Sequence, residues 1–575
     1  MFGSLHLPPS QACVQLKARS LGLASLSRTI ARHRSRIRFL GEGDANTKFF
    51  HLQACHRKRK NYIPSLQHEG LWFSAEQAKQ DLCFDYYNTI LGMPFQRLHA
   101  LHLDSLLPQI DLAGIDGCFS EEEVWAAVRD LPVDRAPGPD GFPADFFKGA
   151  WPVIKTDIIN AFHALWSLDS RSFFLLNGAL MVLLRKNNAP TRLKDYRPIS
   201  LMHSFSKLFS KCLARRLAPK LPGIVAPNQS AFISGRSIHD NFRTVQLSCR
   251  WLHSRRIPVV LLKVDIAKAF DSVAWPFLIE VLHHIGFPRR WINWICILLS
   301  TASTKILVNG VAGRRIAHPR GLRQGDPISP MLFVIVMEVL NSLFGEAVRQ
   351  GALSPLPGRA IRHRVSLYAD DLVLLVSPTP EDLACVRHIL DLFAGASGLL
   401  TNYEKCSAIL IRCSEEMIGA IQSAFPCVLG SFPCRYLGVP LSLQRLRHAD
   451  EQPLVDAIAA RIPTWKAGLL SNAGRTLLTK VTLSAIPVHL SIACCLSKWA
   501  VDQIDKRRRA FLWAGSSPLF ADHLALVALG CLICASSDSP SVYDGNGLPE
   551  HQAMQAGQVC RIDQKRLLLQ WRGQA

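Results

Sequence analysis

Two adjacent aspartates stand between apolar segments in the stretch SLYADDLVLLV, which covers residues 366–376. Apolar and polar residues alternate before the pair and an unbroken apolar run follows it, so the pattern predicts two strands joined by a tight turn. Asp370 and Asp371 fall at that turn. Such a charged turn is common on a solvated surface and is also typical of a metal site, so other parts of the chain must distinguish the two.

A third carboxylate is predicted to follow a separate buried strand. The segment IPVVLLKVD contains an apolar run from about Val259 to Val264, and Asp265 comes directly after it. Carboxylates gathered at one point repel one another unless a cation neutralises them. Mg²⁺ suits such a site because it prefers oxygen ligands and needs only a few carboxylates, together with water and substrate phosphates. Two ions about 4 Å apart can activate a hydroxyl and stabilise a leaving pyrophosphate.

The charge balance indicates a polyanionic partner. The chain of 575 residues carries 66 Lys and Arg against 44 Asp and Glu, a net charge of +22, and 49% of it is hydrophobic. Such a chain can form several domains with real cores. Nucleic acid is the first partner expected and an anionic membrane surface the second. A basic protein with no such partner is the alternative.

Cysteines and apolar runs argue against several other classes. The CxxC at Cys531–Cys534 has no second pair to complete a zinc site, so we expect reduced, intracellular thiols. No run of eighteen apolar residues occurs, and no membrane-spanning helix is predicted. The first 41 residues contain seven Lys or Arg and no acid, as in an organelle transit peptide, but they continue smoothly into another basic segment. The cluster His56–Lys60 is either a solvated face or a phosphate contact.

Capping residues predict the ends of several helices. Ser120 with Glu123 forms a capping box, and Asp271 or Ser272 is expected to cap a helix that stops near Gly286. Further on, Ser329 suits an N-cap with Pro330 at the first helical position. The run ALMVLLRKNN reads as a buried strand, and DYRPIS reads as a turn before a long helix.

An ordered series of motifs now points to a family. DIAKAFD, GLRQGDPISP and YADD occur in this order, preceded by DYRPIS and followed by SGLLTNYEKCSA and RYLGVPLS. Upstream lie EGDANTKFFH and RAPGPDGFPADFFK, and downstream LLSNAGRTLLTKVTLSAIP and IDKRRRAFLW. The series resembles the reverse transcriptase of LINE-type non-LTR retrotransposons, particularly plant ones, over about Arg32 to Gly515.

The resemblance implies an α+β right-hand polymerase fold. Its parts are a basic, mostly helical N-terminal extension over 1–115, a segment before the fingers over 116–167, fingers and palm over 168–443, and a helical thumb-like region over 444–515. The palm is expected to be a small antiparallel sheet packed on helices. Residues 516–575 no longer follow the family, and we expect them to be a poorly ordered tail, from a frameshift or mis-joined gene, or else a novel module.

The resemblance also implies the catalytic ligands. Asp265 is the expected first metal ligand, Asp370 and Asp371 are the pair on the palm hairpin, and the carbonyl of Ile266 adds a backbone oxygen. Two Mg²⁺ ions are expected, with Mn²⁺ as an alternative. Phe270 matches the bulky residue that excludes a ribose 2′-hydroxyl, although an ordinary core phenylalanine is the alternative.

Nucleotide and nucleic-acid contacts follow by the same analogy. Gln324 and Gly325 match the loop against the incoming nucleotide, while Lys186 and Arg197 match the cations that grip its triphosphate. Lys405 is a candidate general acid or a charge near the pyrophosphate, or simply a solvated lysine. The residues expected along the phosphates of an RNA/DNA hybrid are Arg475, Lys480, Lys506, Arg507, Arg508 and Arg509.

The expected partners are an RNA template, a DNA primer and dNTPs, with no membrane partner, and the expected location is the nucleus. No endonuclease, zinc knuckle or RNase H segment is recognisable, so the chain is expected to be a fragment of a retroelement. The main hypothesis is an RNA-directed DNA polymerase. A catalytically silent nucleic-acid-binding remnant is one alternative, and an intron maturase or viral polymerase is another, although YADD and Phe270 argue against the viral one.

Overall fold

The computed structural model describes residues 47–133, 135–356, 361, 363–462 and 470–514, with a few positions between 18 and 25. The chain divides into two compact units, Met1–Arg508 and Arg509–Ala575, and the elements below belong to the first unless stated otherwise. Most of the early basic segment, the CxxC and the predicted C-terminal tail lie outside the described residues.

The described chain is a mixed α+β structure, as predicted. The elements up to the fingers are α2 (Thr47–Asn61), β1 (Leu66–His68), β2 (Leu71–Phe73), α3 (Glu76–Leu91), η1 (Leu103–Ser105), α4 (Glu121–Arg129), α5 (Ala144–Gly149), α6 (Trp151–Trp166) and α7 (Phe173–Leu176). Next come β3 (Gly178–Arg185), η2 (Leu193–Asp195), β4 (Tyr196–Met202), α8 (Ser204–Leu217), α9 (Leu221–Ile224), α10 (Ile238–Ser254), β5 (Val259–Val264), α11 (Ala269–Ser272), α12 (Trp275–Ile285), α13 (Arg289–Ser300), β6 (Ser303–Val308), β7 (Val311–Ala317) and α14 (Ser329–Arg349). The rest are β8 (Val365–Tyr368), β9 (Asp371–Val376), α15 (Pro380–Ser397), β10 (Ser407–Ile411), α16 (Glu415–Ala424), β11 (Val428–Gly430), β12 (Cys434–Tyr436), β13 (Val439–Leu441), α17 (His448–Ala459), α19 (Asn472–Leu478), η3 (Thr479–Leu483), α20 (Ala485–Ala493) and α21 (Lys498–Ala514), the last of which continues into the second unit.

The palm sheet has five strands in the order β11-β10-β5-β9-β8. Its four strands other than β11 pair antiparallel, and β11 runs parallel to β10. Side chains of β5 alternate between two cores: Val260 and Leu262 pack into the larger one and Val259 and Leu261 into a second. The sheet is therefore buried on both faces, which explains why β5 reads as an unbroken apolar run.

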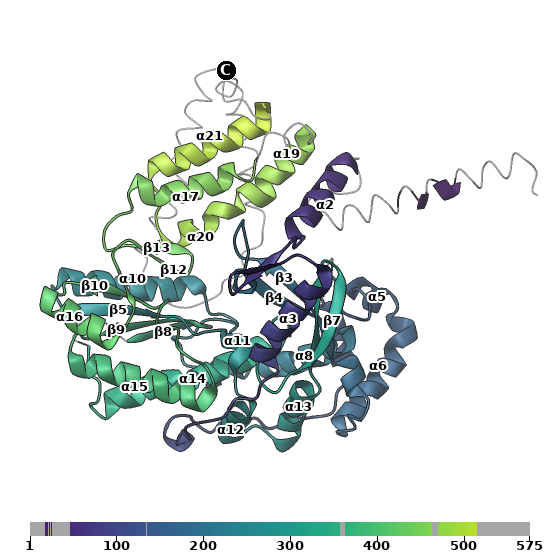
Figure 1. The fold of residues 1–575 in the computed structure, drawn as a ribbon, viewed down its shortest axis with the longest axis horizontal. Helices are drawn as coiled ribbons and strands as arrows, with labels where there is room; N and C mark the ends of the chain where they lie inside the picture. Colours follow the sequence, from purple (N-terminus) through teal and green to yellow (C-terminus); the bar gives the residue numbers. More distant parts are fainter. Residues whose placement is uncertain are drawn as a thin grey trace, which may run out of the picture. The chain divides into compact units, whose positions relative to one another are not determined.

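Helices cover both faces of the palm sheet (Figure 1). Residues of α12, α14 and α15 belong to the larger core, while α10, β12, β13 and α20 contribute to the second. Buried side chains occupy much of α14, including Phe333, Val336 and Leu340. Its apolar composition is thus accounted for by its position in the core.

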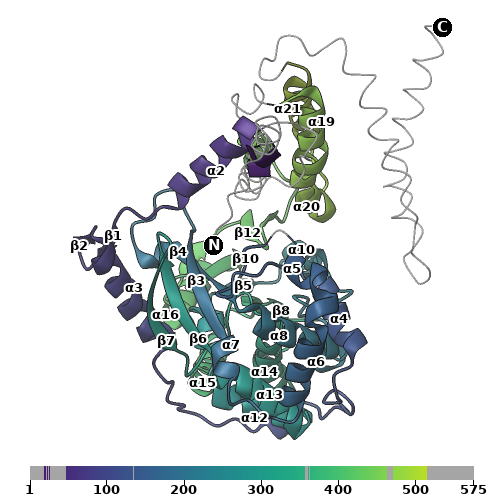
Figure 2. The ribbon, with the colours of Figure 1, turned by 90° about the vertical axis from the view of Figure 1, so that its right-hand side faces the viewer.

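The fingers sheet has four strands in the order β4-β3-β6-β7, and α3 packs against it (Figure 2). Met181 and Leu183 of β3 share a core with Cys83, Tyr87 and other residues of α3. The backbone N–H of Gln67 in β1 also donates to the carbonyl of Thr191, at 2.8 Å. Part of the predicted N-terminal extension is therefore integrated into the fingers.

Helices α17, α19, α20 and the part of α21 up to Arg508 fall within the predicted thumb-like region. It meets α10 through two imidazoles, with His239 Nε2 3.0 Å from His489 Nδ1. His489 Nε2 lies 3.0 Å from the carbonyl of Leu437, and Ser237 Oγ lies 3.2 Å from His239 Nδ1. One set of tautomers satisfies all three contacts, so the two rings connect α10 to α20 through hydrogen bonds.

Several predicted boundaries are confirmed. Ser120 caps α4 by accepting the N–H of Glu123 at 3.2 Å, and Gly286 ends α12 with a φ of +104°. The predicted capping box is only half formed, because the Glu123 carboxylate pairs with Arg216 at 2.7 Å instead of reaching back to Ser120. The strands predicted from Val259 to Val264 and on both sides of Asp370 are present as β5, β8 and β9.

Three other boundaries were predicted wrongly. Asp271 and Ser272 lie inside the short α11, because the chain turns out of it at Val273, whose carbonyl accepts from Gly321. Helix α14 starts one residue earlier than expected, with Ile328 as N-cap and Ser329 already helical, because Asp326 accepts the N–H of Ile328. The DYRPIS motif mostly forms strand β4 rather than a turn. Its proline is tolerated because β4 is at the sheet edge.

Two segments of the described chain are long and apolar enough to cross a membrane by length and composition, which the sequence prediction did not expect. One is α14, whose apolar window is mostly buried in the protein, and the other runs from Asn472 to Ala493. Core helices pass the same test.

Replacing Phe162 with alanine should destabilise the helical side of the larger core. Its ring is fully buried and packs edge-on against Phe119, Phe205 and Phe209. We expect a loss of about 3–5 kcal/mol in the free energy of unfolding, measured by urea denaturation. The matched Phe146→Ala variant removes a ring that is 39% exposed and should cost less than about 1 kcal/mol. Equal losses in both variants would contradict this account of the core.

Candidate active site

The three predicted carboxylates belong to neighbouring strand ends of the palm sheet. Val264 of β5 pairs with Leu372 of β9, so Asp265 and Asp371 come next on adjacent strands. Asp370 lies in the two-residue turn between β8 and β9. The antiparallel register, rather than proximity in sequence, brings Asp265 to the hairpin.

The carboxylates influence one another electrostatically. Burial raises the pKa of both Asp370 and Asp371, and the charge of Asp265 raises each further. The charge of Lys263 acts in the opposite direction on Asp371. The ammonium of Lys405 lies 3.9 Å from Asp265 Oδ2, an exposed pair that screens little of this repulsion. The cluster therefore favours an additional cation.

The donor set suits a hard divalent ion. No group of three His, Cys, Asp or Glu side chains in the described ranges is already gathered closely enough to hold a metal. Mg²⁺ does not require such a group, because it is usually held by one or two carboxylates together with water and substrate phosphates. Asp265 and Asp370 could supply these carboxylates. The carbonyl of Ile266, next to Asp265, remains a predicted backbone ligand.

A buried glutamine holds the tip of the hairpin. Ala369 has a φ of +55°, unusual for a residue other than glycine, and its N–H donates to Gln229 Oε1 at 3.0 Å. The same oxygen accepts the N–H of Ala231, at 3.0 Å. Gln229 is fully buried and its backbone bridges to Leu367. Sequence reasoning missed Gln229, although its motif PNQSAF lies between two recognisable helices.

A second set of buried polar groups holds the strand before the turn. Asn241 of α10 donates to the carbonyl of Leu367 at 2.6 Å and to Ser366 Oγ at 3.1 Å. Ser366 Oγ also lies 3.0 Å from the hydroxyl of Tyr436. These side chains keep β8 in register beside the second core. The sequence showed them only as polar residues in helix or strand patterns.

Glu338 of α14 is a buried carboxylate behind the hairpin. It accepts the N–H of Ala226 at 3.1 Å and the amide of Asn341 at 3.0 Å. Asn341 in turn accepts from Asn228, whose carbonyl accepts the N–H of Leu367. Burial raises the pKa of Glu338 to about 7, although these hydrogen bonds and the charge of Arg236 oppose the shift.

Phe270 stands on the segment between Asp265 and α12. Its ring stacks on Phe333 of α14 with centroids 4.5 Å apart and is only partly buried. Its carbonyl accepts the N–H of Leu322, which ties this segment to the loop that contains Gln324. A ring supported on one side and partly open on the other is compatible with either predicted role.

The loop with Gln324 and Gly325 is fixed from below by a buried arginine. Arg323 donates to the carbonyl of Asn177 at 2.9 Å and also to its side-chain oxygen. Asp326 pairs with Arg323 at 3.9 Å. From above, the N–H of Ser200 donates to the carbonyl of Gln324, at 3.0 Å. Gly325, with a φ of +110°, lies so close to Ser200 that a Cβ would be 2.8 Å from its carbonyl oxygen.

The predicted triphosphate cations influence one another electrostatically. The pKa of Lys186 is lowered by burial and then by the charges of Lys405 and Arg197, while Asp195 and Asp271 oppose that shift. Lys405 is the member of this set that lies beside a carboxylate, 3.9 Å from Asp265 Oδ2. Lys186, Arg197 and Lys405, predicted from three separate motifs, thus form one set of interacting positive charges.

The predicted thumb cations differ in their surroundings. Lys480 and Lys506 are exposed, whereas Arg508 donates to the carbonyl of Leu483 at 3.1 Å and pairs with Asp505. Arg507 donates to Gln503 and Arg475 to Asn472, within their own helices. Arg509 falls in the second compact unit. The nucleic-acid role of all six stays a prediction.

The central part of the chain is similar to known proteins. Residues 184–441 match the model of the family described as reverse transcriptase (RNA-dependent DNA polymerase). The chain is 25% identical to the transposon TX1 uncharacterized 149 kDa protein of Xenopus laevis, over 84% of this chain and 37% of that protein. It is 28% identical to the retrovirus-related Pol polyprotein from the type-2 retrotransposable element R2DM of Drosophila melanogaster, over 54% of this chain and 29% of the relative.

The chain thus spans about a third of the length of these two curated relatives. Among solved structures it matches a telomerase from Candida tropicalis in complex with a fragment of telomeric RNA, with 12% identity and a TM-score of 0.34 over 64% of this chain and 63% of that one.

Replacing Gly325 with alanine should disturb the loop that carries Gln324. The new Cβ would meet the Ser200 carbonyl, and the positive φ disfavours any L side chain. We expect a folded protein whose free energy of unfolding, measured by urea denaturation, is lowered by about 1–3 kcal/mol. The control Gly345→Ala lies near the C-terminal end of α14 with open space around it and should be neutral or stabilising. Wild-type stability of Gly325→Ala would contradict the tight approach.

Glu338 should make stability depend on pH. Its pKa is raised from an ordinary value of 4.5 to about 7 in the fold, so the folded state binds more protons between those values. Its contribution is therefore fully present below about pH 4.5 and is lost as the pH rises through 7. Relative to Glu338→Gln, the wild type should lose on the order of 2–3 kcal/mol across that interval. The free energy of unfolding at a series of pH values measures this, and parallel profiles for the two proteins would contradict it.

Proposed function

We propose that this chain, whose residues 184–441 form a reverse transcriptase domain, is an RNA-directed DNA polymerase of a LINE-type non-LTR retrotransposon, particularly a plant one. It would extend a primer 3′-hydroxyl with dNTPs on an RNA template by phosphoryl transfer. The observation that carries the proposal is the register of β5 and β9, which sets Asp265 beside the Asp370–Asp371 hairpin. The ordered motifs around these residues support the same reading.

Asp265 and Asp370 are the residues proposed to hold divalent metal, with Asp371 beside them. Reverse transcriptases generally use divalent ions, and we propose two Mg²⁺, with Mn²⁺ as a substitute. Bound ions of this kind lower the pKa of an attacking hydroxyl and neutralise charge on phosphate oxygens. The chain's own contribution is to keep the carboxylates together despite their repulsion, through the palm register and the bond from Ala369 to Gln229.

The positive group of Lys186, Arg197 and Lys405 is proposed to bind the triphosphate of the incoming nucleotide. An arginine can grip two phosphate oxygens at once, and an ammonium can stay near the leaving pyrophosphate as a charge or proton donor. Phe270 would close the sugar side against a 2′-hydroxyl, and Gln324 with Gly325 would lie against the nucleotide. Binding would thus fix the phosphorus in line with the primer hydroxyl.

Further cations are proposed to follow the RNA/DNA hybrid. Exposed Lys480 and Lys506 suit phosphate contacts, and such contacts give sequence-independent, salt-sensitive affinity. Arg475, Arg507, Arg508 and Arg509 are proposed to act with them. The excess of basic residues along the chain supports a polyanionic partner. Reverse transcription by such an element would take place in the nucleus.

Primer extension by the purified chain tests the catalytic proposal. The assay uses an oligo(dT) primer on poly(rA) with Mg²⁺ and dTTP. Asp370→Asn should lower the rate by about 1,000-fold, since metal ligation supplies several kcal/mol of transition-state stabilisation. The control Asp145→Asn makes the same chemical change at an exposed position of α5 and should retain wild-type activity.

Two outcomes would count against the proposal. If wild type and Asp370→Asn extend the primer equally, Asp370 is not a catalytic ligand. If the folded wild-type chain binds the hybrid but extends no primer with either Mg²⁺ or Mn²⁺, the silent nucleic-acid-binding alternative takes the place of the polymerase.

A further inference from the structure

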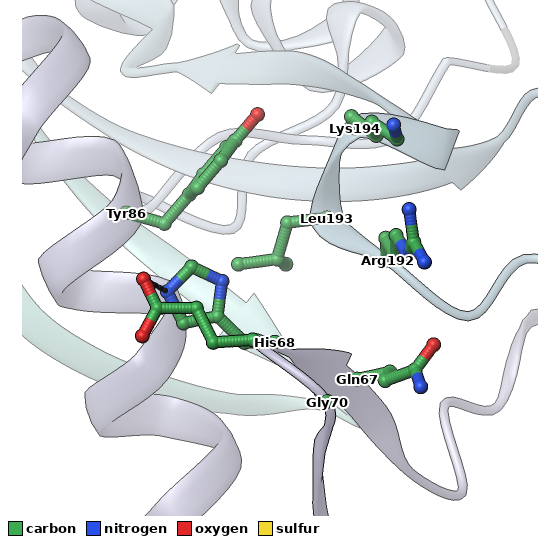
Figure 3. Close-up of a pocket in the computed structure, with 8 residues that line it drawn as sticks. Gln67, His68, Gly70, Tyr86, Arg192, Leu193 and Lys194 are labelled. Atoms are coloured by element: carbon green, nitrogen blue, oxygen red, sulfur yellow. Dashed lines mark ion pairs between the residues drawn. The ribbon is translucent and has the colours of Figure 1, made fainter.

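A pocket lies between the N-terminal part of the chain and the tip of the fingers (Figure 3). Its volume is about 350 Å³, within the range of about 300–1,000 Å³ usual for small-ligand sites. The residues that line it are Gln67, His68, Glu69, Gly70, Tyr86, Arg192, Leu193 and Lys194. They come from the β1–β2 hairpin, from α3 and from the turn before β4. None of the predicted site residues belongs to this wall.

The wall contributed by the fingers is held in a defined shape. Asp195 Oδ2 accepts the N–H groups of Thr191 and Arg192, at 3.2 and 3.0 Å. The carbonyl of Thr191 accepts from Gln67 of β1, which joins the hairpin to this turn. The two walls are therefore connected by a backbone hydrogen bond, which helps to fix the shape of the pocket.

The polar side of the pocket is positive. Arg192 and Lys194 are exposed, and no ion pair involves either of them in the part of the chain that the structure describes. Glu69, the acid in the lining, lies 3.8 Å from His68. A guanidinium and an ammonium that line one pocket with no carboxylate partner favour a phosphate, which the guanidinium can bind through two hydrogen bonds.

The other side of the pocket is apolar and aromatic. Tyr86 is half-buried, and Leu193 is only 4% exposed. Figure 3 shows Leu193 between Tyr86 and Arg192, so the apolar surface adjoins the positive one. Lys268 Nζ lies 5.1 Å from the centroid of the Tyr86 ring, and Tyr87 packs edge-on against it. A supported aromatic ring next to cations is the combination that binds single nucleotides of an unpaired strand.

The pocket adjoins the proposed nucleotide site. The ammonium of Lys186 donates to the carbonyl of Lys194 at 2.7 Å. Lys268, next to Tyr86, is three residues after Asp265 in the DIAKAFD motif. A ligand in this pocket would thus be separated from the triphosphate cations by one turn of the backbone.

We propose that this pocket binds one nucleoside phosphate unit, with its base against Tyr86 and Leu193 and its phosphate against Arg192 and Lys194. The inference rests on the proposed function, since the pocket adjoins the nucleotide site proposed there. Such a unit can belong to the unpaired RNA template ahead of the active site or to a free dNTP. The template is favoured, because the pocket lies outside the triphosphate cations and its cations are exposed to an approaching strand.

Equilibrium binding by the full chain tests the pocket. All proteins carry Asp370→Asn so that no substrate is consumed. Fluorescence anisotropy compares a blunt RNA/DNA hybrid with the same hybrid bearing a four-nucleotide 5′ RNA overhang, at one salt concentration. The overhang should tighten binding by about tenfold, and Arg192→Ala/Lys194→Ala should reduce this gain to less than about twofold.

Further variants separate the base from the phosphate contact. Tyr86→Ala should reduce the tenfold gain in affinity from the overhang by about fivefold. Tyr86→Phe should keep the full gain, since the ring rather than the hydroxyl makes the contact. The control Lys155→Ala/Arg171→Ala removes the same charge from exposed positions outside the pocket and should keep the full gain. Circular dichroism verifies that each variant is folded.

A second arm measures binding of a fluorescent dNTP to the same proteins on a blunt hybrid with one templating base. Weaker dNTP binding in the pocket variants, with the overhang gain intact, would support the pocket and identify free nucleotide as its ligand. An unchanged overhang gain together with unchanged dNTP binding would overturn the proposal. So would an equal loss on blunt and overhanging hybrids, which indicates general charge attraction. Because no turnover is measured, a chain that fails in primer extension can still pass this test.

Discussion

The repulsion among Asp265, Asp370 and Asp371 is the constraint on which the rest of the palm depends. Like charges at adjacent strand ends raise the free energy of the fold, and burial adds to that cost. Apolar packing on both faces of the sheet offsets this cost. The same two cores fix the register of β5 against β9. A one-residue slip would turn Asp265 to the other face and exchange the apolar residues of β5 between the two cores, so the same packing sets both stability and the carboxylate geometry.

Buried polar side chains bind backbone groups of the hairpin and of its supporting segments, which apolar packing cannot satisfy. Ala369 has an unfavourable φ at the turn. This conformation is stabilised because the buried Gln229 side chain accepts the N–H of Ala369. Asn241 secures the preceding strand, and Glu338 secures the segment that presents Gln229. Each of these side chains would be costly to bury alone. They persist because each is hydrogen-bonded to a backbone group of the hairpin or of the segment that supports it.

Local sequence patterns were enough to predict most strands of the palm sheet, but few of the buried polar residues that support them. Strands β5, β8 and β9 could be predicted because each consists of consecutive residues with an apolar run or an apolar–polar alternation. The carboxylates lie at the ends of these segments. The role of Gln229 could not be predicted, since it depends on a hydrogen bond to Ala369, which is 140 residues away in the sequence. Strand β4 was missed because a proline indicates a turn unless the strand is known to be at an edge. The roles of the site residues remain predictions.

Part of the predicted N-terminal extension is packed against the four-stranded sheet of β3, β4, β6 and β7. Helix α3 buries Cys83 and Tyr87 against the fingers sheet, and Lys79 of the same helix is fully buried, donating to the carbonyls of Ile63 and Pro64. A lysine without exposed surface is tolerated only where its ammonium is satisfied, so this contact orders the segment that leads into β1. The hairpin that follows is therefore as well fixed as the fingers it touches. That rigidity is what allows residues more than a hundred positions apart, such as Tyr86 and Arg192, to form one pocket wall next to the nucleotide site.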